Sequence, residues 1–320
     1  MATGDLLDRA STGDKRALAR VLTIVENDEP GAADIVRRTF PQAGRALVLG
    51  VTGPPGGGKS TLVSRLVGAY RAAGKRVAVV AVDPSSPFTG GAILGDRVRM
   101  QRRALDPGVF IRSMGSRGHL GGLARATHDA VRVLDALGKD LVLVETVGVG
   151  QGEVDIVGAA DTVVVVTAPG LGDDVQAIKA GIMEIGDVFV VNKSDREGAD
   201  RAAAELESTL QMAGEISHPA PDSWRPPVLK VSAEKGAGVP ELLAALDAHR
   251  AWQQRTGALA TRRRAAREAE VLEILKARLV RDVLDEERLG PTFRQALAKV
   301  ERGSLDPYAA AQELLDGLAR

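Results

Sequence analysis

The chain has 320 residues, with 42 basic and 42 acidic side chains and no cysteine. The lack of cysteine excludes disulfides and thiolate metal sites, and the zero formal charge gives no general attraction to nucleic acid or anionic membranes. Because no apolar run is long enough to cross a bilayer and no signal-peptide pattern is found, we expect a cytoplasmic protein without a membrane or nucleic-acid partner.

Residues 2 to 40 are predicted to be helical. Their apolar positions recur at roughly helical spacing, with charged residues between them. The run Ser11-Thr12-Gly13-Asp14 indicates a break and a helix cap. This part is too short to form a domain, so we expect residues 1–44 to be a helical extension that packs on the next part of the chain.

Residues 45–250 alternate between short apolar runs and helical stretches. The runs are rich in β-branched residues or leucine, and each ends at a turn signal or a polar residue. Continuous apolar runs of this kind are typical of strands buried on both faces, so the pattern predicts an α/β fold with a mostly parallel, doubly wound sheet. The predicted strands are Ala46–Val51, Val77–Val82, Leu141–Val144, Thr162–Thr167, Val188–Val191 and Val228–Val231.

Residues 251–320 are predicted to form a C-terminal helical arm. The stretch 257–288 has the pattern of one long helix, and Gly290-Pro291 follows it as a break. Its apolar stripe is longer than one globular core needs, so we expect a dimerisation arm and a homodimer. The triplet Arg262-Arg263-Arg264 is interpreted as a solvated face of this helix.

A glycine-rich motif of the form G-x-x-x-x-G-K-[S/T] follows the first predicted strand and opens a predicted helix. Glycines let backbone N–H groups approach phosphates, and the helix N-terminus adds partial positive charge. Lys59 is expected on the β- and γ-phosphates, and the Ser60 hydroxyl on Mg²⁺. The phosphate-binding residues predicted here are Gly53, Pro54, Pro55, Gly56, Gly57, Gly58, Lys59, Ser60 and Thr61.

Two loops predict that the base is guanine. Guanine presents two donors on one edge, which a carboxylate such as Asp195 accepts, whereas adenine would leave that carboxylate unpaired. Asn192 is expected to contact the base or brace the phosphate loop, and the stem of Lys193 to cover the base. Ser232, Ala233 and Glu234 form the second loop, in which the Ala233 N–H is expected to meet the base oxygen.

Carboxylates at two strand ends are candidates for metal binding and catalysis. Glu145 and Asp83 each follow a predicted strand and are expected to hold Mg²⁺ near Ser60. Gly148 is expected to offer its N–H to the γ-phosphate, and Asp96 to join the metal site in one state. Asp96 lies in a Gly- and Ser-rich region, 88–97 and 113–122, which we interpret as switch loops.

These motifs together resemble the MeaB/ArgK family of methylmalonyl-CoA mutase-associated GTPases. The resemblance is carried by V-T-G-P-P-G-G-G-K-S-T-L (51–62), V-D-P-S-S (82–86), G-G-A-I-L-G-D-R-V-R-M (90–100), E-T-V-G-V-G-Q (145–151) and N-K-S-D (192–195), and it covers nearly the whole chain.

The resemblance implies a SIMIBI-class P-loop GTPase that dimerises through its helical arm. It also implies a chaperone of adenosylcobalamin-dependent mutases, in which GTP gates cofactor loading and protects the mutase. Methylmalonyl-CoA mutase is the default client, with isobutyryl- and hydroxyisobutyryl-CoA mutases as alternatives.

The predicted catalytic set is Lys59, Asp83, Glu145 and Gln151. Gln151 lies two residues beyond the place where Ras-like proteins keep a water-orienting glutamine, which is Val149 here. Intrinsic hydrolysis is therefore expected to be slow and stimulated by a partner.

Three other classes of function are open to a P-loop protein. A metal-insertion GTPase of the hydrogenase or urease maturation type needs Cys or His ligands, and this chain has no cysteine and four scattered histidines. The Asn-Lys-x-Asp run argues against a transport-system kinase or another ATPase. A scaffold acting only through the long helix has no need of Lys59 and Ser60.

Overall fold

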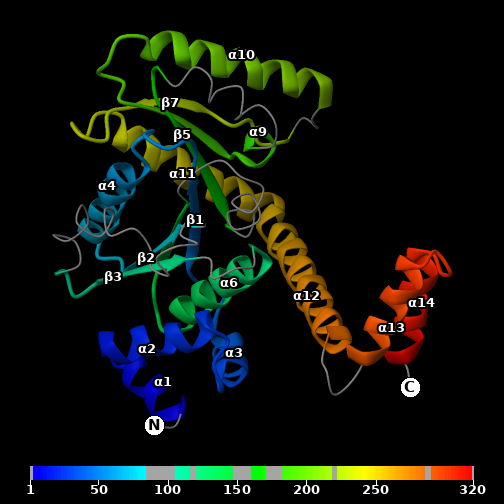
Figure 1. Ribbon diagram of the computed structural model, residues 1–320. Coiled ribbons are helices and arrows are strands. Elements are labelled where there is room, and N and C mark those ends of the chain that lie inside the picture. The colour runs from blue at the N-terminus through cyan, green and yellow to red at the C-terminus, as the bar shows by residue number, and fades with distance from the viewer. Residues whose placement is uncertain are drawn as a thin grey trace. The chain divides into compact units, whose positions relative to one another are not determined.

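The computed structural model describes residues 3–83, 105–115, 120–146, 160–170, 182–217, 222–284 and 290–318. The chain forms two compact units, Met1–Arg264 and Ala265–Arg320. The first unit holds the sheet together with the N-terminal helices, and the second holds most of the long C-terminal helix and the two helices after it (Figure 1). None of the described helices combines the length and apolarity needed to cross a bilayer.

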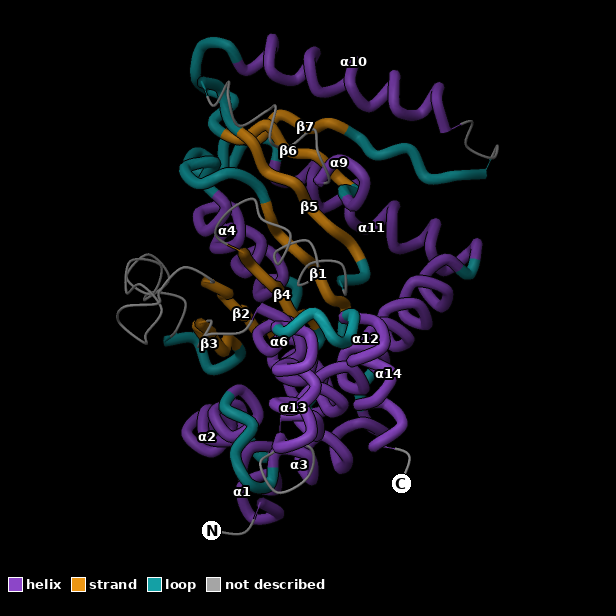
Figure 2. The backbone as a smooth tube through the Cα atoms, turned by 45° about the vertical axis from the view of Figure 1, so that its right-hand side comes forward, coloured by secondary structure: helices purple, strands orange, loops and turns teal. Residues whose placement is uncertain are grey.

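A seven-stranded sheet lies at the centre of the first unit, with the order β3-β2-β4-β1-β5-β6-β7. All strand pairs among the described residues are parallel, which confirms the predicted α/β fold. Figure 2 shows the strands of the sheet side by side. β1, the strand before the glycine-rich motif, lies between β4 and β5. The strands are β1 Leu47–Thr52, β2 Val77–Asp83, β3 Val109–Gly115, β4 Leu141–Thr146, β5 Thr162–Thr167, β6 Val188–Asn192 and β7 Val228–Val231.

The strand β3 was not among the predicted strands. It is an edge strand, and Ile111, Arg112 and Ser113 are only partly buried, so its sequence lacks a continuous apolar run. The interpretation of 113–122 as a switch loop is wrong at both ends. Ser113–Gly115 complete β3, and Leu120 begins the helix α6, Leu120–Ala136. Residues 116–119 and 88–97 lie outside the described residues.

The N-terminal residues form three α-helices, α1 Thr3–Ser11, α2 Lys15–Glu26 and α3 Ala32–Thr39, followed by the short 3-10 helix η1 Phe40–Gln42. The predicted cap is confirmed, because the Asp14 side chain accepts from the N–H groups of Arg16 and Ala17 at the start of α2.

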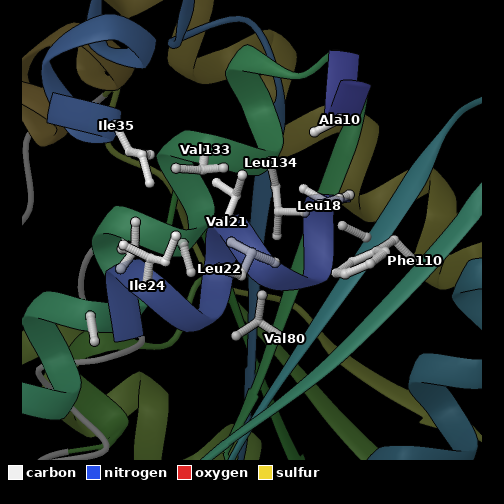
Figure 3. Packing of buried hydrophobic residues seen from close by; sticks show 14 of the residues in the cluster. Ala10, Leu18, Val21, Leu22, Ile24, Ile35, Val80, Phe110, Val133 and Leu134 are labelled. Atoms are coloured by element: carbon white, nitrogen blue, oxygen red, sulfur yellow. The ribbon is translucent and has the colours of Figure 1, made fainter. Parts of the chain in front are cut away.

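The buried face of α2 packs against α6 and one face of the sheet. Figure 3 shows Val21 and Leu22 of α2 among side chains of α6 and of the strands, including Leu134 and Val80. Burying an aliphatic side chain of this size contributes about 1.5–3 kcal/mol, so these helices are part of the core.

Helices cover both faces of the sheet, as a doubly wound fold requires. Alternate residues of a strand point to opposite faces of the sheet. Val80 and Val82 therefore pack against α2 and α6 on one face, while Val77 and Val79 lie in the core on the other face. That other face is covered by α4 and α11, and α10 covers β5 and β6. The helices are α4 Lys59–Ala72, α9 Ile182–Ile185, α10 Ala199–Ser217 and α11 Val239–Thr256.

The C-terminal residues are helical, as predicted. α12 spans Ala258–Leu284, directly after Gly257, whose φ of +76° ends α11 in the left-handed conformation that suits glycine. A new helix begins at Gly290, where a break was predicted. The last two helices are α13 Gly290–Glu301 and α14 Pro307–Leu318.

Two ion pairs join the second turn of α12 to the residues just before β6 and β5, so the interpretation of the arginine triplet as a solvated face is wrong for two of its members. Arg262 Nη1 donates to Asp187 Oδ2 at 2.7 Å. Arg263 donates from Nε and Nη2 to the two carboxylate oxygens of Asp161, each at 2.7 Å. Asp161 also accepts from the Val48 N–H of β1 at 2.9 Å.

Arg263→Ala is expected to lower the free energy of unfolding by about 3–5 kcal/mol, because it leaves the buried Asp161 carboxylate without its cation. Arg264 is exposed and provides the matched control, so Arg264→Ala should change stability by less than about 0.5 kcal/mol. Chemical denaturation of the full chain measures both. Equal stabilities of the two variants would contradict this role of Arg263.

Candidate functional site

The glycine-rich motif forms the loop between β1 and α4, at the carboxyl edge of the sheet. Gly53 has a φ of +132°, and a Cβ there would lie 2.0 Å from the Val166 carbonyl oxygen, so only glycine fits. The Lys59 side chain is buried, and its Nζ donates to the carbonyl oxygens of Gly53 at 2.6 Å and Pro54 at 3.0 Å. The amine therefore lies inside the curve of the loop.

Ser60 and Glu145 are brought together, as the metal prediction requires. The Ser60 Oγ donates to Glu145 Oε1 at 2.6 Å, and Glu145 is buried. Val51 of β1 is the register partner of Glu145. Ser60 lies in the first turn of α4, after the loop that follows β1, so the pairing of β1 with β4 brings the two residues to the same edge. A hydroxyl beside a carboxylate is an oxygen donor pair of the kind that Mg²⁺ prefers, so these residues fit the ion.

Of four other predicted residues, only Asp83 is placed, and only by its backbone. Asp83 is the last residue of β2, beside β4, at the same edge of the sheet as Glu145, and its side chain is not described. Asp96, Gly148 and Gln151 lie outside the described residues. Their roles stay predictions.

Asn192 links the base side of the site to the phosphate loop. It ends β6, is buried, and donates from Nδ2 to the Gly57 carbonyl at 2.8 Å. Its Oδ1 accepts the Ala233 N–H at 3.0 Å, so this N–H, predicted for the base oxygen, is directed at Asn192 here. Lys193 has a φ of +56° and donates from Nζ to the Gly56 carbonyl at 2.6 Å, which lays its stem over the loop.

Asp195 is held as an ionised acceptor. Ser232 Oγ donates to its Oδ1 at 2.7 Å, and Lys235 Nζ lies 3.1 Å from its Oδ2. The hydrogen bond from Ser232, with that from Lys235, lowers the pKa of Asp195 to about 2. The carboxylate is therefore ionised at any physiological pH and accepts hydrogen bonds only. Two loops far apart in sequence, around residues 195 and 232, thus meet in one place.

Two basic residues of the site were missed by the sequence analysis. Lys235 follows the second base loop directly and pairs with Asp195. Arg65 lies on α4 and donates from Nε to the Ala233 carbonyl at 2.7 Å. Lys235 could have been predicted, because it is adjacent to Glu234 of the second base loop. Arg65 could not, because it is 168 residues from Ala233 and no motif near it indicates this contact.

A comparison with protein families identifies the family to which a chain with this site belongs. The model described as methylmalonyl Co-A mutase-associated GTPase MeaB matches residues 18–288. The chain belongs to the MeaB family. Its activity is the hydrolysis of GTP, and both the resemblance and the GTPase prediction are confirmed.

MeaB relatives match along almost the whole chain. A Pyrococcus abyssi protein named as a GTPase is 50% identical over 311 residues, which are 97% of this chain and 95% of the relative. GTPase ArgK of Escherichia coli is 35% identical over 314 residues, 96% of this chain and 93% of that protein. The crystal structure of a LAO/AO transport system kinase has a TM-score of 0.71 at 26% identity, and the match covers 99% of this chain and 98% of that one.

Proposed function

We propose that this GTPase is a chaperone of an adenosylcobalamin-dependent acyl-CoA mutase, with methylmalonyl-CoA mutase as the first candidate client. GTP binding and hydrolysis would gate cofactor loading and protect the mutase from inactivation. The observation that carries the proposal is the family match over residues 18–288, because its description names the mutase as the associated protein. The Pyrococcus abyssi and Escherichia coli relatives are named as GTPases, and their names leave the client open.

Different residues of the site would bind the phosphates, the base and Mg²⁺ during hydrolysis. The backbone of the loop 53–58 and the Lys59 amine would hold the phosphates, while Asp195 accepts the donors of guanine. Ser60 and Glu145 would hold Mg²⁺, which supplies charge neutralisation on the β- and γ-phosphates when bound. Catalysis by this chain then consists mainly of positioning and electrostatic stabilisation, since phosphoryl transfer needs little covalent chemistry from the protein.

The helix α12 supports a homodimer in this proposal. Within its described residues, Val271, Leu272, Leu275 and Val280 are each half or more exposed. Apolar side chains gathered on one helix are a common mark of an association surface. A second copy of the chain is the occupant we propose, through the part of α12 beyond Arg264.

Size-exclusion chromatography with light scattering tests both associations. The chain alone should give twice the 33.5 kDa mass at micromolar concentration. With GTP and a purified methylmalonyl-CoA mutase from the same cell, it should elute as a larger complex, and the mutase should raise the GTPase rate by about 10-fold or more. Leu272→Glu with Leu275→Glu should give the monomer mass.

A monomer mass for the unaltered chain would refute the dimer. Failure of the mutase both to bind and to stimulate hydrolysis would refute that client. Isobutyryl-CoA mutase in the same assay then serves as the alternative, and a negative result with both would refute the chaperone proposal.

A further inference from the structure

Arg65 connects the helix that follows the phosphate loop to the loop on the base side of the site. It lies on α4, six residues after Lys59, and is exposed, whereas Leu62 and Leu66 of the same helix are buried. Its Nε donates to the Ala233 carbonyl at 2.7 Å, and its Nη2 donates to the Glu234 carbonyl. One guanidinium thus binds two consecutive carbonyl groups of one loop.

The same loop is held from its other side by Asn192. The Ala233 N–H donates to Asn192 Oδ1, and Asn192 Nδ2 donates to the Gly57 carbonyl. Ala233 is 1% exposed, so its peptide groups have little freedom to move. The contacts close a ring that runs from Gly57 through Asn192 and Ala233 to Arg65, and back along α4 to the phosphate loop.

Ser232, the first residue of this loop, donates to Asp195 Oδ1 at 2.7 Å. Any movement of the loop therefore displaces both the Ala233 N–H and a hydroxyl that orients the Asp195 carboxylate. Arginine suits this task because its planar fork presents several donors in fixed directions, whereas a lysine ammonium is a single mobile point charge.

We propose that Arg65 is a positioning residue for guanine selectivity, which fixes the loop 232–234 so that the Ser232 hydroxyl holds the Asp195 carboxylate in place for the base edge. The inference rests on the proposed assignment of Asp195 to the base. Preorganisation favours the ligand that the loop contacts, because less ordering of the loop remains to be done on binding. These contacts of Arg65 are to the base loop and not to the phosphate loop. Its removal should therefore weaken the binding of the base more than the binding of the triphosphate.

Steady-state hydrolysis with ATP as a competitor separates these effects. Arg65→Ala should raise the KM for GTP about 10-fold, with kcat changed by less than about 2-fold, because charged hydrogen bonds at a partly exposed site have moderate strength. The inhibition constant of ATP should stay within about 2-fold of the wild-type value, so the preference for GTP over ATP narrows. Arg65→Lys should restore only part of the lost affinity.

Arg71 provides a matched control on the same helix. Its guanidinium pairs with Asp106 through Nε at 2.9 Å and donates to the Lys75 carbonyl, away from the base loops. Arg71→Ala should leave the KM for GTP and the ratio of GTP to ATP unchanged. A thermal melt of each variant shows whether the loss of either arginine only loosens the fold.

Two results would overturn the proposal: a KM for GTP unaffected by Arg65→Ala, or a parallel loss of GTP and ATP binding. Asp195→Asn in the same assay distinguishes the failures. If Asp195→Asn also leaves GTP binding intact, then the base assignment itself is wrong. If it weakens GTP binding while Arg65→Ala does not, then only the role of Arg65 is refuted.

Discussion

Lys59→Ala should reduce GTP hydrolysis by about 100-fold to 1,000-fold, the range for loss of one preorganised charge stabiliser in a buried site. The Lys59 amine is buried within the loop, where it contacts the carbonyl oxygens of Gly53 and Pro54. A cation in this place offsets charge on the transferring phosphoryl group, and no neighbouring side chain on the loop repeats its position. Phosphate release at saturating GTP measures the effect.

Lys59→Arg tests whether charge alone suffices. The Lys59 side chain is 6% exposed, so the broader guanidinium lacks room, and we expect this variant to be nearly as inactive as the alanine variant. Lys276→Ala is the control, since that lysine is exposed on α12 and pairs with Glu273. Circular dichroism confirms folding of each variant. Hydrolysis by Lys59→Ala within about 3-fold of the wild-type rate would remove Lys59 from the catalytic set.

Most of the strands that could be predicted lie between two other strands; β7, an edge strand with a partly exposed run, is the exception. β4 and β5 consist of buried residues throughout, and such runs are visible without knowledge of their neighbours. β3 has one strand neighbour and carries Arg112, which pairs with Glu26 of α2. Its identity as a strand depends on a helix that lies far away in the sequence, so the local pattern could not reveal it.

The candidate site also has parts that could be predicted from the sequence and parts that could not. The phosphate loop and the run from Asn192 to Asp195 are contiguous motifs, and their chemistry could be predicted residue by residue. The contacts between them could not. Arg65 finds its carbonyl partners in another loop, and Arg263 finds Asp161 across 102 residues. A charged residue on a helix has the same sequence pattern whether it is solvated or paired, so only the fold distinguishes these cases.

Asp195→Asn should weaken GTP binding by about 100-fold and shift the preference toward xanthosine triphosphate. The Asp195 carboxylate offers only acceptors, which match the two donors of guanine. An asparagine amide replaces one acceptor with a donor, so it opposes one guanine donor and instead matches the carbonyl that xanthine carries in place of the amine. Isothermal titration calorimetry with GTP and with xanthosine triphosphate measures the exchange.

The pH dependence of GTP binding tests the same carboxylate independently. Because the pKa of Asp195 is lowered from 3.8 to about 2, the group stays ionised as the pH falls to 4, where a carboxyl group of ordinary pKa would be partly protonated, and protonation of Asp195 should cost no GTP affinity in that range. For the substitution Asp195→Asn, the matched control is Asp200→Asn, since Asp200 is an exposed carboxylate paired with Lys230. If Asp195→Asn binds GTP as tightly as Asp200→Asn does, Asp195 does not read the base, and the selectivity for guanine must arise from the backbone of the loop 232–234.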